Sequence, residues 1–418
     1  MQPAIRNLQS ATDEPTWGRP VQAEIDLSAI ASNVRAIKKV VGPSCKIMAV
    51  VKADGYGLGA PWVAGAALEG GASWLAVACV DEGVQLRRAG YSGRILVMGY
   101  VTPDEAAAAV ANRLTLNLHR ARTAYALEEA AKVSGLGSGD VRIHIKVDTG
   151  LGRYGCLPEE FLPLVDEISR LPHLHIEGLN THFANADSPD LSFAREQLAR
   201  FNKLRAEAAE RGLHFEIVHA ANSAAALALP EARLDMVRVG IMLSGYLPSE
   251  HLASKVSLTR AVTLRSRLAR VYEANIGHTV GYGRTWTAQG HSVLGLVPVG
   301  YADGYSRLVS NMGVVLVHGV RCPVVGRVSM DQMGVDLTGV PDALEGDEVV
   351  LIGKQGADEI TADELAGWIG TISYEVLCGL SARVPRRYIR NGEPVEEYNL
   401  LGRKSGAGKK RAQKELSR

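Results

Sequence analysis

Between about residues 45 and 245, short apolar runs alternate with stretches of helical period that are rich in Ala, Leu, Glu and Arg. Some of these runs, such as Ile47–Val51, are apolar at every position, as is typical of parallel strands covered on both faces. Eight strand–helix repeats predict an α/β fold with an N-terminal (β/α)8 barrel, whose active-site groups follow the strands. The expected strands are Lys46–Val51, Trp74–Ala78, Arg94–Met98, Leu114–Leu118, Val141–Val147, Leu174–Leu179, Glu216–His219 and Met236–Ile241. An open doubly wound sheet is the alternative, although no G-x-G-x-x-G follows the first run.

After about residue 255 the pattern changes to alternating apolar and polar residues interrupted by Gly and Pro, which predicts a second, mostly β domain. Its expected strands are Val262–Arg270, His291–Val299, Val314–Val317, Pro323–Val328, Gly334–Leu337 and Glu348–Ile352. The segment Ala23–Leu27 alternates in the same way and could join either domain. We therefore expect an N-terminal extension over residues 1–20, a barrel over 21–255, a β domain over 256–400 and a tail over 401–418.

Composition and charge narrow the class of partner. The 418 residues carry 46 basic and 45 acidic side chains, so charge gives no reason to expect nucleic acid or a membrane as partner. A small molecule or a protein is the expected partner. The tail is basic and poor in apolar residues, which predicts disorder, with a nucleic-acid contact as the alternative. Five scattered cysteines, an acidic and Pro-containing start and no long apolar run indicate a cytoplasmic protein without disulfides or a metal site.

A lysine ends the first expected barrel strand, in the segment AVVKADGYGLG. Desolvation at the mouth of a barrel disfavours the charged ammonium and leaves a nucleophilic amine, which a Schiff base requires. Taken alone, Lys52 is equally well explained as a strand-end lysine that reaches water. Polar clusters follow four later strands and would meet Lys52 on one face; they contain Arg153, His182, Asn222 with Ser223, and Arg238 with Gly240 and Ile241.

The loops after the seventh and eighth strands of such barrels frequently bind phosphate through backbone N–H groups. Ser223 and the amides of Gly240 and Ile241 form a candidate phosphate site there. A Schiff-base lysine after the first strand, combined with this phosphate site, suits pyridoxal phosphate as the cofactor.

Nine segments of the chain resemble, in the same order, sequences of the alanine racemase family. The members of this family are pyridoxal-phosphate enzymes with an N-terminal barrel and a C-terminal β domain. The resemblance runs from about Ala23 to Tyr388. Nine matching segments in the same order identify a family specifically, whereas a single matching segment would be weak evidence. The segments are AVVKADGYG, KVDTGLGRYG, NTHFANAD, HAANSAA, VRVGI, VGYGRTW, VGYADGY, GRVSMDQ and TISYEVLCGLSARVPR. The resemblance implies interconversion of L- and D-alanine, which would supply D-alanine for peptidoglycan in the cell wall.

The resemblance also implies which residues move protons. Lys52 would hold the coenzyme and act on one face of Cα, and Tyr282 of the partner subunit in a homodimer would act on the other. A phenol titrates near ~10, so it needs positive neighbours to act as a base at neutral pH, and His182 and Arg238 are the candidates. Arg238, oriented by His219, would donate a hydrogen bond to the pyridine nitrogen without protonating it.

Further residues would hold the coenzyme and the substrate by the same resemblance. The phosphate would be held by Tyr56, Ser223, Gly240, Ile241 and Tyr374, while Asn222 would shape the adjacent loop. Arg153 and the backbone N–H of Met330 would bind the substrate carboxylate.

Lys146 would be carbamylated and would orient Arg153, or alternatively would be an ordinary lysine paired with an acid such as Asp148. Tyr301 and Tyr374 would form a narrow gate that excludes side chains larger than methyl. Residues expected to line the entrance or support the dimer are Arg307, Arg327, Asp331, Ile372, Arg383 and Arg386.

Three other functions stay open at this point. A broad-specificity or serine racemase on the same scaffold would turn over larger amino acids. A decarboxylase of the same architecture would release carbon dioxide and has no evident need for a tyrosine opposite the lysine. A non-catalytic pyridoxal-phosphate-binding protein would not need the second domain to supply Tyr282 and Met330.

Overall fold

The computed structural model describes residues 19–405 and confirms the expected barrel of eight parallel strands within them. The sheet order is β8-β7-β6-β5-β4-β3-β2-β9, so strands adjacent in the sequence are neighbours in space and β2 also pairs with β9. The strands are β2 (Lys46–Val50), β3 (Trp74–Val77), β4 (Ile95–Val97), β5 (Thr115–Leu118), β6 (Val141–Lys146), β7 (Leu174–Asn180), β8 (Ile217–His219) and β9 (Met236–Val239).

Alternate residues of each barrel strand point into and out of the barrel, and both directions are buried. Met48 and Val50 of β2 pack inside with Trp74, whereas Ile47 and Ala49 pack outward in the main core. This double burial explains the continuous apolar runs of the sequence. The seam between β8 and β9 is bridged by separate hydrogen bonds, including Arg238 N–H to the Ala221 carbonyl at 3.0 Å.

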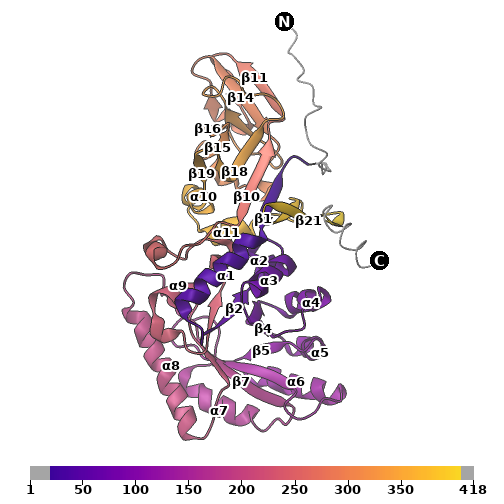
Figure 1. Ribbon diagram of the computed structural model, residues 1–418, viewed down its shortest axis with the longest axis vertical. Coiled ribbons are helices and arrows are strands. Elements are labelled where there is room, and N and C mark those ends of the chain that lie inside the picture. Colours follow the sequence, from indigo (N-terminus) through magenta and orange to yellow (C-terminus); the bar gives the residue numbers. More distant parts are fainter. Residues whose placement is uncertain (1–18, 406–418) are drawn as a thin grey trace.

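Helices surround the barrel in the lower half of Figure 1. The first begins because Asp26 accepts hydrogen bonds from the amides of Ser28 and Ala29, and it buries Ile30, Val34 and neighbouring apolar residues against the barrel. The α-helices of this part are α1 (Leu27–Val41), α2 (Lys52–Tyr56), α3 (Ala60–Glu69), α4 (Val80–Arg88), α5 (Ala106–Ala111), α6 (Ala121–Val133), α7 (Pro158–Ile168), α8 (Ser192–Glu210) and α9 (Ser223–Ala228).

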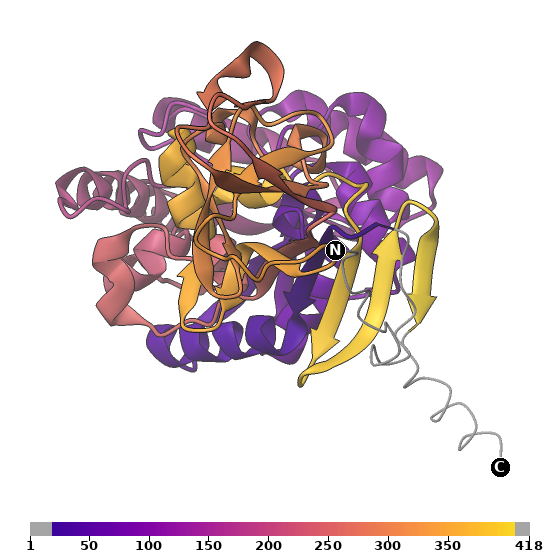
Figure 2. The same ribbon diagram turned by 90° about the horizontal axis from the view of Figure 1, so that it is seen from above.

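The second domain is mostly β, as expected, and lies over one end of the barrel (Figures 1 and 2). Its strands are β10 (Val262–Arg267), β11 (Arg270–Ala274), β12 (Thr279–Val280), β13 (Trp286–Thr287), β14 (Ser292–Val297), β15 (Val314–Val317), β16 (Val320–Val325), β17 (Met333–Asp336), β18 (Glu348–Gln355), β19 (Asp358–Ile360), β20 (Arg386–Arg390), β21 (Glu393–Asn399) and β22 (Gly402–Ser405). Two short helices, α10 (Ala362–Ile369) and α11 (Ser373–Cys378), pack beside this sheet.

Short 3₁₀ turns connect the regular elements of both domains. They are η2 (Pro103–Glu105), η3 (Pro230–Ala232), η4 (Ile241–Ser244), η5 (Glu250–Lys255), η6 (Tyr282–Arg284), η7 (Tyr301–Asp303) and η8 (Arg307–Val309).

The chain begins in the β domain and then enters the barrel. β1 (Gln22–Asp26) pairs antiparallel with β10 and parallel with β20, so this strand belongs to the sheet of the β domain. At the other end, Gly402–Ser405 forms β22 on β21, so the expectation of disorder from residue 401 is wrong for these residues because backbone pairing orders them. The rest of the basic tail and most of the N-terminal extension lie outside the described residues. Every helix within residues 19–405 is too short or too polar to span a bilayer.

The two domains meet at the turn that follows β2. The Arg386 guanidinium donates to the Gly57 carbonyl at 3.0 and 3.3 Å and also to the Leu380 and Val384 carbonyls. Gly57 adopts a left-handed φ of +81°, and a Cβ there would lie 2.2 Å from the carbonyl oxygen of Leu377 in α11. The β domain therefore fixes the turn that carries Lys52.

Candidate active site

Lys52 begins a strained turn directly after β2. Ala53, Asp54 and Tyr56 all have positive φ angles, at 51°, 53° and 59°. Such left-handed conformations are unfavourable for residues with a Cβ and persist only where the surroundings hold them. Here Glu82 accepts from the Ala53 amide at 2.7 Å, and Asp54 accepts from the Ala60 amide at 2.9 Å.

A small polar cradle lies where the turn after β2 meets the turns after β8 and β9. The Gly240 amide donates to Ser223 Oγ at 3.1 Å, and the Tyr56 hydroxyl fills the space where a Gly240 side chain would stand. Tyr56 packs near Tyr374 of α11, with ring centroids 6.1 Å apart. Burial raises the pKa of both phenols, so they are protonated hydrogen-bond donors at neutral pH.

Two further residues predicted for this cradle are chain neighbours of Ser223 and Gly240. Asn222 accepts from the Ala225 amide at 2.9 Å and thereby caps α9, so it shapes the loop. Ile241 is buried and begins η4 directly after Gly240.

Arg238 is buried in β9 and is held on several sides. One terminal nitrogen lies 2.7 Å from His219 Nδ1, and the other lies 3.1 Å from His182 Nδ1. Three backbone carbonyls, those of His219, Ala220 and Thr181, also accept from the guanidinium. Burial lowers the pKa of Arg238 to about 9, so the group stays charged at neutral pH.

Four basic side chains lie near His182. Burial and then the charges of Arg238, Lys146, Arg153 and Lys52 lower the pKa of His182 well below its usual range. Burial and the nearby basic groups thus disfavour the charged form of His182, which speaks against His182 as the source of positive charge for a phenol. Arg238, the other candidate, stays charged.

Lys146 forms no ion pair with a carboxylate within residues 19–405. It is buried at the end of β6, and burial, followed by the charges of Arg238 and Arg153, lowers its pKa well below the usual range. Asp148, the acid considered as its partner, instead accepts from the amides of Gly150, Leu151, Gly152 and Arg153 at 2.8–3.1 Å. Asp148 raises the pKa of Lys146 by the smallest of the effects on this amine, and no contact within the described residues supports an ordinary ion pair between the two.

The remaining predicted residues lie together on the β domain. Tyr282 and Met330 are 72% and 52% exposed and line a shallow pocket of about 440 Å³ with Asp331 and three neighbours from the same domain. Its six lining residues include none from the barrel, so this pocket does not join Tyr282 to Lys52 within one chain.

A backbone hydrogen bond and two ion pairs stabilise the same surface. Tyr301 donates its amide to the Ser329 carbonyl at 3.1 Å, which holds η7 against the segment that contains Met330. Arg383 binds Asp331 at 2.7 Å and the buried Asp303 at 2.8 Å.

Sequence reasoning missed several residues that build the site. Glu82 holds the Lys52 turn, and Asp303 anchors Arg383. His144 contacts His219, with 2.9 Å between ring nitrogens. His144 was detectable in principle, because it precedes Lys146 by two residues on a strand and so shares its face. Glu82 and Asp303 carried no comparable signal.

The residues present fit pyridoxal phosphate. Lys52, Lys146 and Arg153 form no ion pair with any Asp or Glu in the described part of the chain. An unpaired amine beside a cradle of hydroxyl groups and amides suits a coenzyme with an aldehyde and a phosphate. Lys52 would hold the aldehyde carbon, and Tyr56, Ser223 and Gly240 would hold the phosphate.

Comparison with known proteins agrees with this geometry. Family models of the alanine racemase N-terminal and C-terminal domains match residues 25–248 and 261–388. The chain is 48% identical over 373 residues to the alanine racemase of Symbiobacterium thermophilum, covering 88% of this chain and 97% of that protein. The crystal structure of alanine racemase from Bacillus anthracis with bound L-Ala-P gives a TM-score of 0.86 at 36% identity, covering 93% of this chain and 99% of that one. This chain belongs to the alanine racemase family.

Proposed function

We propose that this chain interconverts L- and D-alanine with pyridoxal phosphate held by Lys52, and that Lys52 and Tyr282 exchange the Cα proton on opposite faces. The observation that carries the proposal is that Lys52, which forms no ion pair with an acid in the described chain, begins the same turn that places Tyr56 in the cradle with Ser223 and Gly240. When bound, the coenzyme withdraws electrons from Cα and so makes its proton acidic.

Arg238 sets the electronic character of the coenzyme. A guanidinium donates hydrogen bonds but keeps its protons, so Arg238 leaves the pyridine nitrogen unprotonated. A ring in that state is a weaker electron sink, which favours return of a proton to Cα over competing reactions. This character supports racemisation over decarboxylation.

Tyr282 acts from the second subunit of a homodimer. Three observations support this arrangement: Tyr282 is 72% exposed, Met330 is 52% exposed, and the pocket they line is built from one domain only. A second copy that placed this surface over the barrel mouth would bring the phenol near Arg238, whose charge favours phenolate. It would also explain why a racemase needs the β domain.

Arg153 and Met330 bind the carboxylate of the amino acid. Arg153 is exposed at the barrel mouth, and no ion pair occupies its guanidinium within residues 19–405. Arg153 lies close enough to Lys146 that the guanidinium charge lowers the pKa of the lysine. A neutral amine adds carbon dioxide to give a carbamate anion and a proton, and the anion would orient Arg153.

Tyr301 and Tyr374 restrict the entrance to small side chains. Tyr374 packs against Tyr56, and Tyr301 is held by the Met330 segment. The comparisons do not favour a broad-specificity or serine racemase on the same scaffold. We also propose a cytoplasmic location and a role in supplying D-alanine to the cell wall.

Two measurements test the function. Borohydride should bleach the visible band of the holoenzyme and fix the coenzyme onto Lys52, as peptide mapping would show. A panel of single enantiomers should then give faster racemisation of alanine than of serine or lysine. Label on another lysine would reject the assignment of Lys52, and equal turnover of serine would reject a narrow substrate range.

A further inference from the structure

We propose that Glu177 and His144 are positioning residues that act through His219 to hold Arg238 as a fixed hydrogen-bond donor toward the coenzyme. The proposal deepens the proposed function and rests on it. It concerns a row of polar side chains inside the barrel, on strands β6 to β9.

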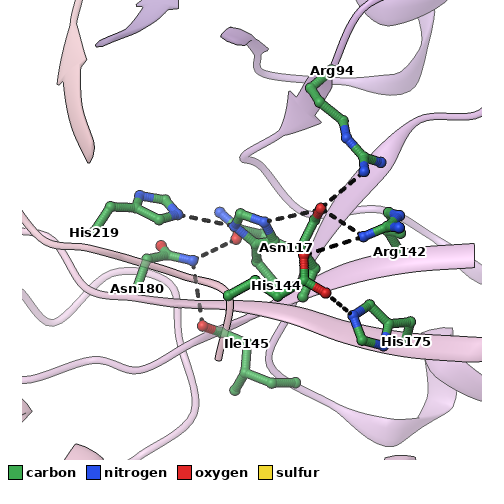
Figure 3. A network of polar contacts seen from close by, with 10 residues as sticks. Arg94, Asn117, Arg142, His144, Ile145, His175, Asn180 and His219 are labelled. Carbon is green, nitrogen blue, oxygen red and sulfur yellow. Dashed lines mark hydrogen bonds and ion pairs between the residues drawn. The ribbon is translucent and has the colours of Figure 1, made fainter. Parts of the chain in front are cut away.

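The row consists of two short contacts, followed by a longer one to a carboxylate. Arg238 lies 2.7 Å from His219 Nδ1, and His219 Nε2 lies 2.9 Å from His144 Nδ1. His144 Nε2 in turn faces Glu177 Oε2 at 3.6 Å, which is longer than a hydrogen bond, and neither of these buried atoms has another hydrogen-bond partner within the described residues. Arg94 and Arg142 bind the other oxygen of Glu177 at 3.1 and 2.9 Å. Figure 3 shows Arg142 and His144 of β6 close to Arg94, which precedes β4, and to His219 of β8.

The donors in this row must all point the same way. Arg238 can only donate, so His219 Nδ1 must accept and the His219 proton must sit on Nε2. His219 then donates to His144 Nδ1, which places the His144 proton on Nε2, facing Glu177. The negative charge of the Glu177 carboxylate, which can only accept, favours the His144 proton on the nitrogen that faces it. A proton on His219 Nδ1 would instead oppose the Arg238 N–H.

The backbone is adapted to the contact between His144 and Glu177. The register between β6 and β7 shifts so that Ile143 pairs with Ile176 and His144 pairs with Gly178, leaving Glu177 as the extra residue of a bulge. A Cβ on Gly178 would lie 2.7 Å from the His144 ring. The bulge turns Glu177 inward, and the glycine makes room for the imidazole.

Charges around Glu177 keep it ionised. Burial alone would raise the pKa of Glu177, but His144, Arg94 and Arg142 together lower it below the ordinary value. Burial is also the largest reason that the pKa values of His144 and His219 are lowered, so both rings stay neutral and each has one donor nitrogen. The two aligned bonds, from Arg238 to His219 and from His219 to His144, polarise each other, and the Glu177 charge favours this alignment.

Glu177→Gln is the decisive variant. Arg94 and Arg142 are donors, so the carboxamide oxygen must face them and the amide nitrogen must face His144. That amide would donate to His144 Nε2, move the His144 proton to Nδ1 and reverse the row up to Arg238. Glu216→Gln is the matched control, since Glu216 also lies near Arg142, at 3.5 Å, but is exposed and outside the row.

The histidine tautomers are read in the holoenzyme by long-range proton–nitrogen NMR after nitrogen-15 labelling of histidine. We expect Nε2 protons on His144 and His219 in the parent and in Glu216→Gln, and an Nδ1 proton on at least one of them in Glu177→Gln. We also expect kcat to fall roughly tenfold or more in Glu177→Gln, with the KM for alanine within about twofold of the parent.

An Nδ1 proton on His219 in the parent would overturn the proposal, and this result does not depend on whether the variant folds. A folded Glu177→Gln variant with parental kcat, or with lower kcat but parental tautomers, would overturn it as well. Failure of the parent to racemise alanine would instead contradict the proposed function and leave the tautomer measurement interpretable.

Discussion

The hydroxyl of Tyr56 lies beside Gly240, so closely that a Cβ on Gly240 would stand 2.1 Å from the phenolic oxygen. Tyr56 follows β2 and Gly240 follows β9, and these two strands pair side by side where the barrel closes. The contact therefore joins the first and last strands of the barrel at the candidate phosphate cradle.

Gly240→Ala should destabilise the protein by about 1–3 kcal/mol, because the new methyl group overlaps the Tyr56 hydroxyl. Urea unfolding at fixed coenzyme concentration measures this change. Adding Tyr56→Phe should recover part of the loss by removing the oxygen. Gly290→Ala is the control, since a Cβ there meets nothing within 4 Å. Equal effects at the two glycines would contradict the steric argument.

Tyr282→Phe should lower racemisation by about 10²–10⁴-fold in both directions, because it removes the proton carrier on one face. Exchange of the Cα proton with deuterated solvent should persist for the enantiomer that Lys52 deprotonates and disappear for the other. Tyr125→Phe, on the outer helix α6 and bound to Glu167, serves as the control. Parental racemisation by Tyr282→Phe would rule out the two-base scheme.

Mixing inactive Lys52→Ala and Tyr282→Phe chains should restore activity if the site is shared between subunits. A mixed dimer has one site with both Lys52 and Tyr282, so random exchange should recover roughly one quarter of the parental rate. Mass spectrometry of differently tagged chains verifies the exchange. Proven exchange with no recovered activity would show that each site lies within one chain.

Carbon-13 NMR with labelled bicarbonate should detect a carbamate in the parent that is missing from Lys146→Ala. The reason is the lowered pKa of Lys146, which leaves a neutral amine able to add carbon dioxide. The KM for alanine should rise in the variant, because Arg153 loses its orienting anion. Lys203→Ala, at an exposed lysine of α8, should keep the signal. A carbamate signal that survives in Lys146→Ala would place the modification elsewhere.

Stability should fall as the pH drops below about 6.5. Burial lowers the folded-state pKa of His144, His182 and His219 below the unfolded value of 6.5. Below that pH the unfolded chain binds protons that the folded chain does not, so this stability is complete above pH 6.5 and is lost toward lower pH.

Each of the three histidines should contribute up to about 1.4 kcal/mol per pH unit. Calorimetric Tm values between pH 8 and 5 measure the slope, and exposed His251→Gln should leave it unchanged. A Tm that stays constant over this range would mean that the rings are not buried as described.

The sequence predicted barrel strands such as β2 and β4 because a strand buried on both faces is apolar at most positions. It also placed Lys52, Ser223 and Arg238 at one end, since the carboxyl ends of parallel strands share an edge. Alternation alone could not assign β1 to a sheet, because a strand with one buried face fits either domain. Its pairing with β10 and β20 decided this.

The amino-acid sequence by itself determined the fold class, the family and which chemical groups face the barrel mouth. Only the tertiary structure decided that the pKa values of His182 and Lys146 are both lowered, because ionisation depends on burial and on charges brought from distant strands. The bulge that turns Glu177 toward His144 was likewise invisible in the sequence. Register between neighbouring strands is set by pairing across space, and a local pattern of residues does not record it.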